Sequence, residues 1–226
     1  MQKNIFFISG LGTDRRTYSR LKLDFEERIV YVDWLVPEKR DTMQSYAQRL
    51  VEKYGMRENA IIVGTSFGGM LASEISKIIN NPLNILIASA SHKNELMAWL
   101  PIVTKLRLNK VVPKGMFTRP GRFTERLMGV PNNVKSGYLR EGVEMFRQMI
   151  KDMHPDFIWW GIDSVVNWKH DERLPNIIKI HGDRDKLIPI YNQPDDYLIK
   201  GGSHFLVWTR AKEVSEILNK VVLEQA

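Results

Sequence analysis

Short apolar runs alternate with amphipathic stretches along most of this chain. Six apolar runs predict β-strands, at residues 3–8, 28–32, 60–63, 83–88, 176–180 and 196–200. Residues 43–54 carry apolar side chains at helical spacing, with Asp41 as the expected N-cap and Gly55 as the stop. A second helix is expected over 70–79, and a closing helix from about Ala211.

This order of elements predicts an α/β fold. Strands that alternate with helices form βαβ units, so we expect a mostly parallel sheet of about six strands with helices on both faces. The alternation stops between Ser91 and Trp168, where helix-like stretches are separated by prolines. We therefore expect a core formed by residues 1–90 and 170–226, with residues 91–169 inserted as a helical cap. Because chemistry in parallel sheets collects at the carboxyl ends of the strands, such a cap would roof the site.

Composition narrows the class of protein. The 226 residues suit one domain, or one domain with an insertion. The absence of cysteine excludes disulfides, thiol nucleophiles and cysteine-ligated metals. The apolar start is interpreted as a first strand rather than a signal peptide, and no run reaches the roughly 18 residues of a membrane span. A cytoplasmic enzyme is the expectation.

Positive charge is concentrated in one segment. The formal net charge is +7, and residues 101–140 hold nine basic side chains against one acidic one, Glu125. A solvated surface explains this pattern, and so does a basic surface that attracts an anionic substrate or an acidic partner protein. Nucleic-acid binding is disfavoured, because the segment contains no recognised nucleic-acid module.

The pentapeptide Gly64-Thr65-Ser66-Phe67-Gly68 carries the clearest chemical signal. It lies between the strand at 60–63 and the helix at 70–79, where a Gly-x-Ser-x-Gly sequence forms a sharp turn that exposes the serine hydroxyl. The glycines are needed because the turn brings backbone segments together. Ser66 is thus the candidate nucleophile.

A serine hydroxyl needs a base, and the base needs an orienting acid. His204 follows the strand at 196–200, and Asp185 follows the strand at 176–180. Asp183 lies in the same loop as Asp185 and competes for the same role. The candidate groups therefore come in the order Ser, Asp, His, each at the carboxyl end of a different strand.

The chain resembles the α/β-hydrolase superfamily. The resemblance rests on the Gly64–Gly68 turn, on Gly182-x-x-Asp185-x-x-x-Pro189 and on Gly202-x-His204-Phe205. It implies hydrolysis of an ester, thioester or amide without a cofactor or metal, and its spacing favours Asp185 as the acid. Two strands that begin the family fold are missing here. Serine at the turn argues against the haloalkane dehalogenase and epoxide hydrolase branches, whose nucleophile is aspartate.

The same resemblance locates the donors of an oxyanion hole. One backbone N–H should come from Phe67, after the nucleophile, and the other from the loop that follows the first strand, where Leu11 is the candidate. This loop reads Ser9-Gly10 where the family often has His-Gly, so a side chain that braces the loop is lost.

The remaining histidines are expected to be structural. His92, His154, His170 and His181 form no pair with metal-ligand spacing, so no metal site is predicted. Large apolar residues of the cap are expected to form its core and part of an apolar pocket.

Taken together, the sequence predicts a serine hydrolase that acts on a small carboxylic ester or acyl thioester, similar to carboxylesterases. One alternative is an acyl group carried on an anionic carrier, such as coenzyme A or an acidic protein, and recruited by the basic segment. Two others are a lyase and a non-catalytic ligand receptor with the same fold. The oligomeric state stays open.

Overall fold

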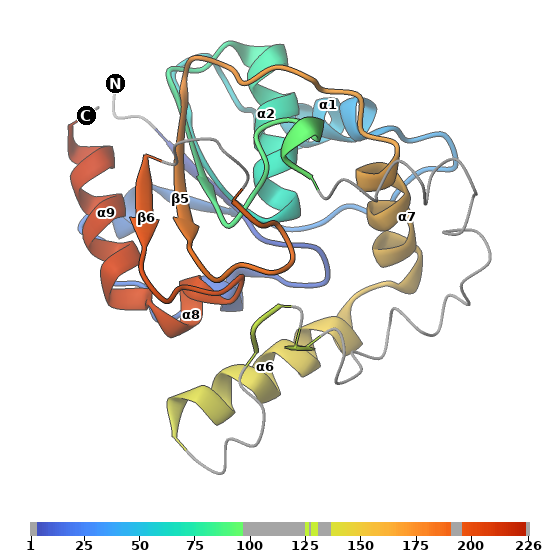
Figure 1. Ribbon diagram of the computed structural model, residues 1–226. Helices are drawn as coiled ribbons and strands as arrows, with labels where there is room; N and C mark the ends of the chain where they lie inside the picture. Colours follow the sequence, from blue (N-terminus) through green and yellow to red (C-terminus); the bar gives the residue numbers. More distant parts are fainter. Residues whose placement is uncertain (1–3, 97–124, 127, 131–136, 191–195, 225–226) are drawn as a thin grey trace.

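The computed structural model describes residues 4–96, 125–126, 128–130, 137–190 and 196–224. Its centre is a six-stranded, all-parallel sheet in the order β2-β1-β3-β4-β5-β6 (Figure 1). The strands are β1 (Ile5–Ile8), β2 (Ile29–Val32), β3 (Ile61–Thr65), β4 (Leu83–Ile87), β5 (Ile177–Gly182) and β6 (Tyr197–Ile199). All six predicted strands are present, and the predicted fold class is confirmed.

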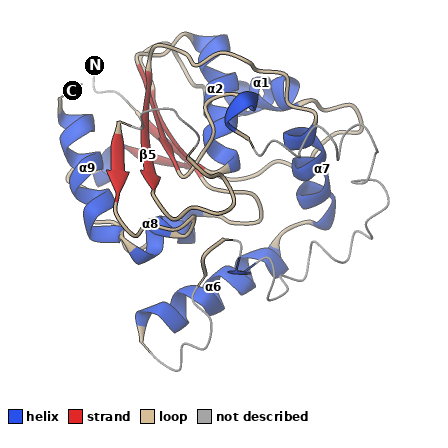
Figure 2. Cartoon of the chain, viewed as in Figure 1, coloured by secondary structure: helices blue, strands red, loops and turns tan. Residues whose placement is uncertain are grey.

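Helices lie on both sides of this sheet (Figure 2). The α-helices are α1 (Met43–Tyr54), α2 (Phe67–Ile79), α6 (Tyr138–Asp152), α7 (Pro155–Val166), α8 (Leu206–Thr209) and α9 (Ala211–Leu223). Three short 3₁₀ turns are η1 (Arg15–Tyr18), η2 (Glu26–Arg28) and η3 (Lys93–Glu95). Helices α1 and α2 cover one face together with Phe157 of α7, whereas α8, α9 and η1 cover the other.

Strand β1 shows how the alternation of side chains builds two cores. Phe6 and Ile8 point into the apolar cluster under α1 and α2, while Ile5 and Phe7 point into the cluster under α9. All four are at most 2% exposed. Each such side chain contributes about 1.5–3 kcal/mol by burial, which is why a strand inside a parallel sheet is apolar on both faces.

The start of α1 differs from the prediction by one residue. The N-cap is Thr42 rather than Asp41, because the backbone is still extended at Thr42. Thr42 accepts a hydrogen bond from the Ser45 N–H (3.1 Å) and donates its own N–H to the Ser45 hydroxyl (2.9 Å). This reciprocal pair is a capping box, with Ser45 as the third helical residue. The predicted stop is confirmed, since Gly55 has a φ of 61°.

The predicted cap is described only in part. Most of the basic segment 101–140 lies outside the described residues, so the expected division between core and cap stays a prediction. The helices α6 and α7 fall within the predicted cap. Helix α6 lies beyond the ends toward which β5 and β6 point (Figure 1), and its apolar side packs with Ile158 of α7.

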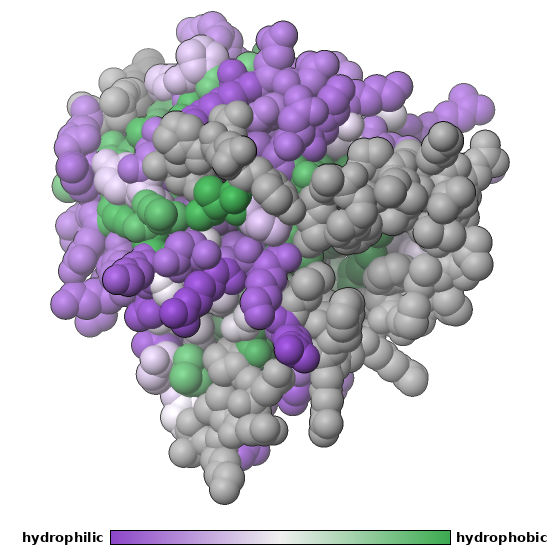
Figure 3. Space-filling model, viewed as in Figure 1, coloured by the Kyte–Doolittle hydropathy of each residue, from purple (hydrophilic) through white to green (hydrophobic). Residues whose placement is uncertain are grey.

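The face of the molecule drawn in Figure 3 is largely polar where it is described. On the face drawn in Figure 3, hydrophilic residues dominate and hydrophobic ones form small patches. Within the described ranges, no helix combines the length and apolar character needed to cross a membrane.

Candidate active site

Ser66 occupies a strained turn between β3 and α2. Its φ of 52° and ψ of −120° lie in a region that residues other than glycine rarely adopt. Four hydrogen bonds hold the backbone of this residue. Its N–H donates to Ile87 O (2.9 Å), and its carbonyl accepts from the N–H groups of Gly69 (2.9 Å) and Met70 (3.3 Å) and from the Ser89 hydroxyl (2.6 Å). The strain is therefore balanced by contacts with β4 and α2.

Two glycines of the pentapeptide allow this turn to close. A Cβ at Gly64 would overlap the backbone of Gly68 and Gly69, and a Cβ at Gly68 would overlap the carbonyl groups of Ile8 and Ser9. A side chain at either position would push the turn away from the sheet. The sequence motif thus has a direct steric cause.

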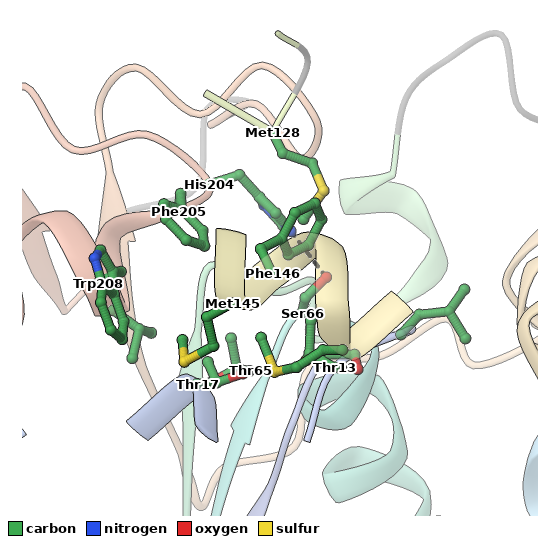
Figure 4. Close-up of a pocket in the computed structure, with 14 residues that line it drawn as sticks. Thr13, Thr17, Thr65, Ser66, Met128, Met145, Phe146, His204, Phe205 and Trp208 are labelled. Atoms are coloured by element: carbon green, nitrogen blue, oxygen red, sulfur yellow. Dashed lines mark hydrogen bonds between the residues drawn. The ribbon is translucent and has the colours of Figure 1, made fainter. Parts of the chain in front are cut away.

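The structure brings Ser66, His204 and Asp185 into one hydrogen-bonded chain. The Ser66 Oγ lies 2.9 Å from His204 Nε2, as the dashed line in Figure 4 marks. The other ring nitrogen of His204, Nδ1, lies 2.7 Å from Asp185 Oδ2. His204 and Asp185 are only 5% and 6% exposed, so water has little access to this chain.

Asp185 is held in its ionised form. Its Oδ1 accepts hydrogen bonds from the N–H groups of Leu187 (2.8 Å) and Ile188 (2.9 Å). The Nε2 of His181 lies 3.2 Å from Asp185 Oδ2 and 2.8 Å from Ile188 O. Burial by itself would raise the pKa of Asp185, but the charge of His204 and the hydrogen bonds from both histidines hold that pKa well below its ordinary value. The carboxylate can therefore stabilise a positive imidazolium.

Asp183 has a different task. Its exposed carboxylate accepts the Gly201 N–H at 2.6 Å, and Arg184 N–H donates to Gly202 O at 2.8 Å. These bonds join the loop that carries Asp185 to the loop that carries His204. Asp183 thus fastens the two loops together, whereas Asp185 contacts the imidazole.

The two expected oxyanion donors belong to two different segments near Ser66. Phe67 is the first residue of α2, and Leu11 lies in the loop after β1 and lines the cavity described below. Among the described residues, neither the Leu11 nor the Phe67 N–H donates a hydrogen bond to another protein group. Both donors are therefore available to a bound atom, and their role stays a prediction.

A small cavity of about 40 Å³ opens beside Ser66 and His204 (Figure 4). Its wall is mostly apolar, with threonine hydroxyls near the serine. The lining residues are Gly10, Leu11, Thr13, Thr17, Thr65, Ser66, Met128, Met145, Phe146, Met149, His204, Phe205, Val207 and Trp208. Helix α6 and the start of α8 thus supply most of the apolar surface that faces the hydroxyl.

The other histidines lie away from the serine. His154 is the half-exposed N-cap of α7, and His170 is buried against Trp168. His92 hydrogen-bonds the Ser91 hydroxyl (3.0 Å). In the parts of the chain that are described, no three acidic or histidine side chains gather in a way that could hold a metal ion.

Two contributors were not anticipated. Ser89, which fixes the Ser66 carbonyl, comes two residues after β4, and the only signal for it is that β4 neighbours β3 in the sheet. His181 was expected to be structural, and it does bond Ile188 O, but it also contacts the carboxylate of Asp185. Its position four residues before Asp185 could have indicated this contact.

The all-parallel sheet, the serine turn and the strand-end loops define the α/β-hydrolase fold, and comparison with solved structures confirms that the chain has it. A thermophilic esterase from Thermogutta terrifontis superposes with a TM-score of 0.74 at 14% identity, covering 100% of this chain and 91% of the other. A putative lipase from Acinetobacter baumannii gives 0.68 at 16% identity, covering 99% and 84%.

A meta-cleavage product hydrolase from Pseudomonas fluorescens gives a TM-score of 0.64 at 16% identity, covering 100% of this chain and 92% of the other. No family model and no curated protein sequence matches the chain. At such identities the likeness establishes the fold, and any activity has to be argued from the site.

Proposed function

We propose that this protein is a serine hydrolase that cleaves small carboxylic esters through an acyl-enzyme intermediate. The observation that carries the proposal is the hydrogen-bonded chain from Asp185 through His204 to Ser66, whose serine end lines an apolar cavity. The esterases and hydrolases among the structural neighbours are consistent with it.

The chemistry follows from the donor and acceptor order. Ser66 Oγ attacks the acyl carbonyl while His204 Nε2 accepts its proton, and the same nitrogen then protonates the leaving group. Asp185 keeps the His204 Nδ1 protonated, so that Nε2 carries the lone pair, and it stabilises the imidazolium that forms. In the second half, His204 activates a water molecule that releases the acyl group from Ser66.

The N–H groups of Leu11 and Phe67 would stabilise the oxyanion. Each is a backbone donor without a described protein partner. Loss of one such donor commonly costs about 10²–10³ in kcat. Backbone donors suit this purpose because they are fixed before the reaction and need no reorganisation.

The cavity argues for a small acyl group. About 40 Å³ of space beside the nucleophile is a few times the room that one water molecule needs, about 10–15 Å³ on the same measure. Methionine, phenylalanine and tryptophan side chains, together with Leu11 and Val207, form most of its wall, and they favour a short alkyl chain over a charged acyl group.

An anionic leaving group is a second candidate, and the local charge of residues 101–140 favours it. The substrate would then be an acyl thioester or ester on a phosphorylated or acidic carrier. Reversal of Arg119, Arg122 and Arg126 to glutamate should raise KM for an acyl-coenzyme A in a salt-dependent way. Equal effects on a neutral ester would remove this candidate.

The central test compares Ser66→Ala with the wild type on p-nitrophenyl acetate and butyrate. Removal of the nucleophile should lower kcat by at least about 10⁴. A fluorophosphonate should label the wild type at Ser66 and leave the variant unlabelled. Ser19→Ala is a matched control, because the exposed Ser19 hydroxyl bonds only the Arg16 carbonyl among the described groups.

Two results would reject the proposal. Undiminished turnover by the folded Ser66→Ala variant would show that another group is the nucleophile. Wild-type protein that neither turns over any ester nor reacts with the fluorophosphonate would instead favour a ligand receptor, and cleavage of a cyanohydrin with no ester turnover would favour a lyase.

A further inference from the structure

The loop that carries the proposed oxyanion donor is anchored to the core at its two ends. Thr13 N–H donates to Gly10 O (3.0 Å), and the Thr13 carbonyl accepts from the Ser9 hydroxyl (2.8 Å) and from Trp34 Nε1 (2.7 Å). Ser9 thus provides a brace at the position where the resemblance suggested that one is lost. Between these anchors, the backbone of Leu11 makes no hydrogen bond within the described chain.

Packing against α6 and α7 fixes the tip of this loop, Leu11 and Gly12, where the Leu11 backbone has no hydrogen bond within the described chain. The Leu11 side chain fills the space over Gly161 of α7. Gly12, with a φ of 77°, lies under Ile150 and Ile158, and a Cβ there would come within 3.3 Å of Ile150 Cγ1. The tip of the loop is therefore enclosed between the sheet and the two helices.

Gly161 is an unusual residue for the interior of α7. Glycine disfavours a helix relative to alanine, so its presence calls for a steric reason. A Cβ at this position would overlap Leu11 Cδ1 and would lie 3.2 Å from Cδ2 and 3.3 Å from Cγ. Leu11 also packs against the core cluster under α1 and α2, which restricts its escape to another rotamer.

Two polar contacts connect the same loop to α6. The Asp14 N–H donates to the sulfur of Met149 (3.4 Å). Arg16 bridges Asp14 and Asp152, with its Nη2 2.6 Å from the first carboxylate and 2.7 Å from the second. The loop is thus bound to the C-terminal half of α6 as well as to α7.

From these contacts we infer that α6 and α7 set the position of the Leu11 N–H, with Gly161 as the positioning residue. The inference rests on the proposed function, because it assigns a purpose to the donor loop of that site. A misplacement of about 1 Å in a catalytic group can cost about 100-fold in rate. The helices above the site thereby control transition-state stabilisation in addition to covering the substrate.

The test is a double-mutant cycle of Gly161→Ala and Leu11→Ala. Gly161→Ala should lower kcat for p-nitrophenyl butyrate by about tenfold or more, with KM changed less than about twofold, because the lost interaction exists only in the transition state. Trimming Leu11 removes the overlap, so the double variant should recover at least about threefold of the loss that Gly161→Ala causes.

A thiono ester gives a readout that general damage would not produce. Sulfur in place of the carbonyl oxygen accepts weaker hydrogen bonds, so Gly161→Ala should slow the oxygen ester about fivefold or more beyond the thiono ester. Lys151→Ala, at an exposed position of α6, is the control and should change neither rate. Thermal melting verifies that each variant is folded.

If Gly161→Ala does not fold, Asp152→Asn replaces it, since it loosens the Arg16 bridge without touching the core. It should lower kcat a few-fold with the same preference for the oxygen ester. Wild-type kcat in the folded variants, equal losses on both esters, or no recovery in the double variant would overturn the inference. Failure of the proposed function is distinct, because Ser66→Ala would then retain turnover.

Discussion

Replacement of Asp185 by asparagine should reverse the proton order in the hydrogen-bonded chain of Ser66, His204 and residue 185, and it leaves the number of heavy atoms unchanged. The Oδ1 position faces the N–H groups of Leu187 and Ile188 at 2.8 and 2.9 Å, so the asparagine carbonyl should occupy it. The amide NH₂ then points at His204 Nδ1. In this orientation the side chain bonds Leu187, Ile188 and His204, and its NH₂ group meets one other donor, His181. In the flipped orientation it bonds the two histidines only, and its NH₂ group meets two donors, the N–H groups of Leu187 and Ile188.

With an NH₂ group at Nδ1, the His204 ring must carry its proton on Nε2. That proton faces the Ser66 hydroxyl at 2.9 Å, so the ring can no longer accept the serine proton. The expected loss is about 10⁴ in kcat, or about 5.4 kcal/mol at about 1.36 kcal/mol per tenfold change. Little of this loss should appear in KM.

The assay is steady-state hydrolysis of p-nitrophenyl butyrate, with Asp183→Asn as the matched variant. The Asp183 carboxylate bonds only the Gly201 N–H among the described groups, so kcat should stay within about threefold of the wild type. Retention of more than a tenth of the activity by folded Asp185→Asn would refute the tautomer argument. If Asp183→Asn lost more activity than Asp185→Asn, Asp183 would be the residue that orients His204.

Three further predictions concern stability and specificity. Glu95→Ala removes the carboxylate 3.0 Å from the buried Lys179 ammonium, so it should lower the free energy of unfolding by about 3–5 kcal/mol. The double variant Glu95→Gln with Lys179→Met should lose far less stability. Equal losses for the two variants in urea titrations would contradict this prediction. The pKa of Asp185 is lower in the folded protein than in the unfolded chain. Its contribution to stability is therefore complete above about pH 4 and is lost as the pH falls through the folded pKa. Asp185→Asn should weaken the loss of stability at acid pH, and an unchanged acid dependence would argue against an ionised Asp185 as its source. Met145→Ala opens the cavity wall, so the ratio of kcat/KM for a hexanoyl ester to that for a butyryl ester should rise about tenfold. This factor follows from about 0.8 kcal/mol for each of the two additional methylenes that become buried. A constant ratio would show that Met145 does not limit the length of the acyl chain.

The fold was predictable because its signals are local. Each strand is an apolar run bounded by turn residues, and burial on both faces of a parallel sheet requires that composition. The first residue of α1 was harder to predict than the strands. Asp41 and Thr42 are both good caps, and only the extended backbone at Thr42 together with the Ser45 hydroxyl selects the second.

The proximity of Ser66, Asp185 and His204 was predictable from the sequence, whereas the contacts that hold them in place were not. Ser66, Asp185 and His204 could be found because each follows a strand, and strand ends of a parallel sheet share one edge. The Ser89 contact and the Leu11–Gly161 packing join segments that are distant in the chain. A single sequence carries no signal for such pairs, because their distances arise only once the sheet order and helix packing are fixed.

The sheet distributes the three groups over strands of unequal support. Ser66 leaves β3, which has neighbours on both sides. His204 follows β6, a three-residue strand at the margin whose only partner among the described strands is β5. Marginal strands open more readily than central ones. Mild heat or dilute denaturant should therefore abolish the proposed ester hydrolysis while the core stays folded. The activity should return promptly on cooling, as those three residues pair with β5 again.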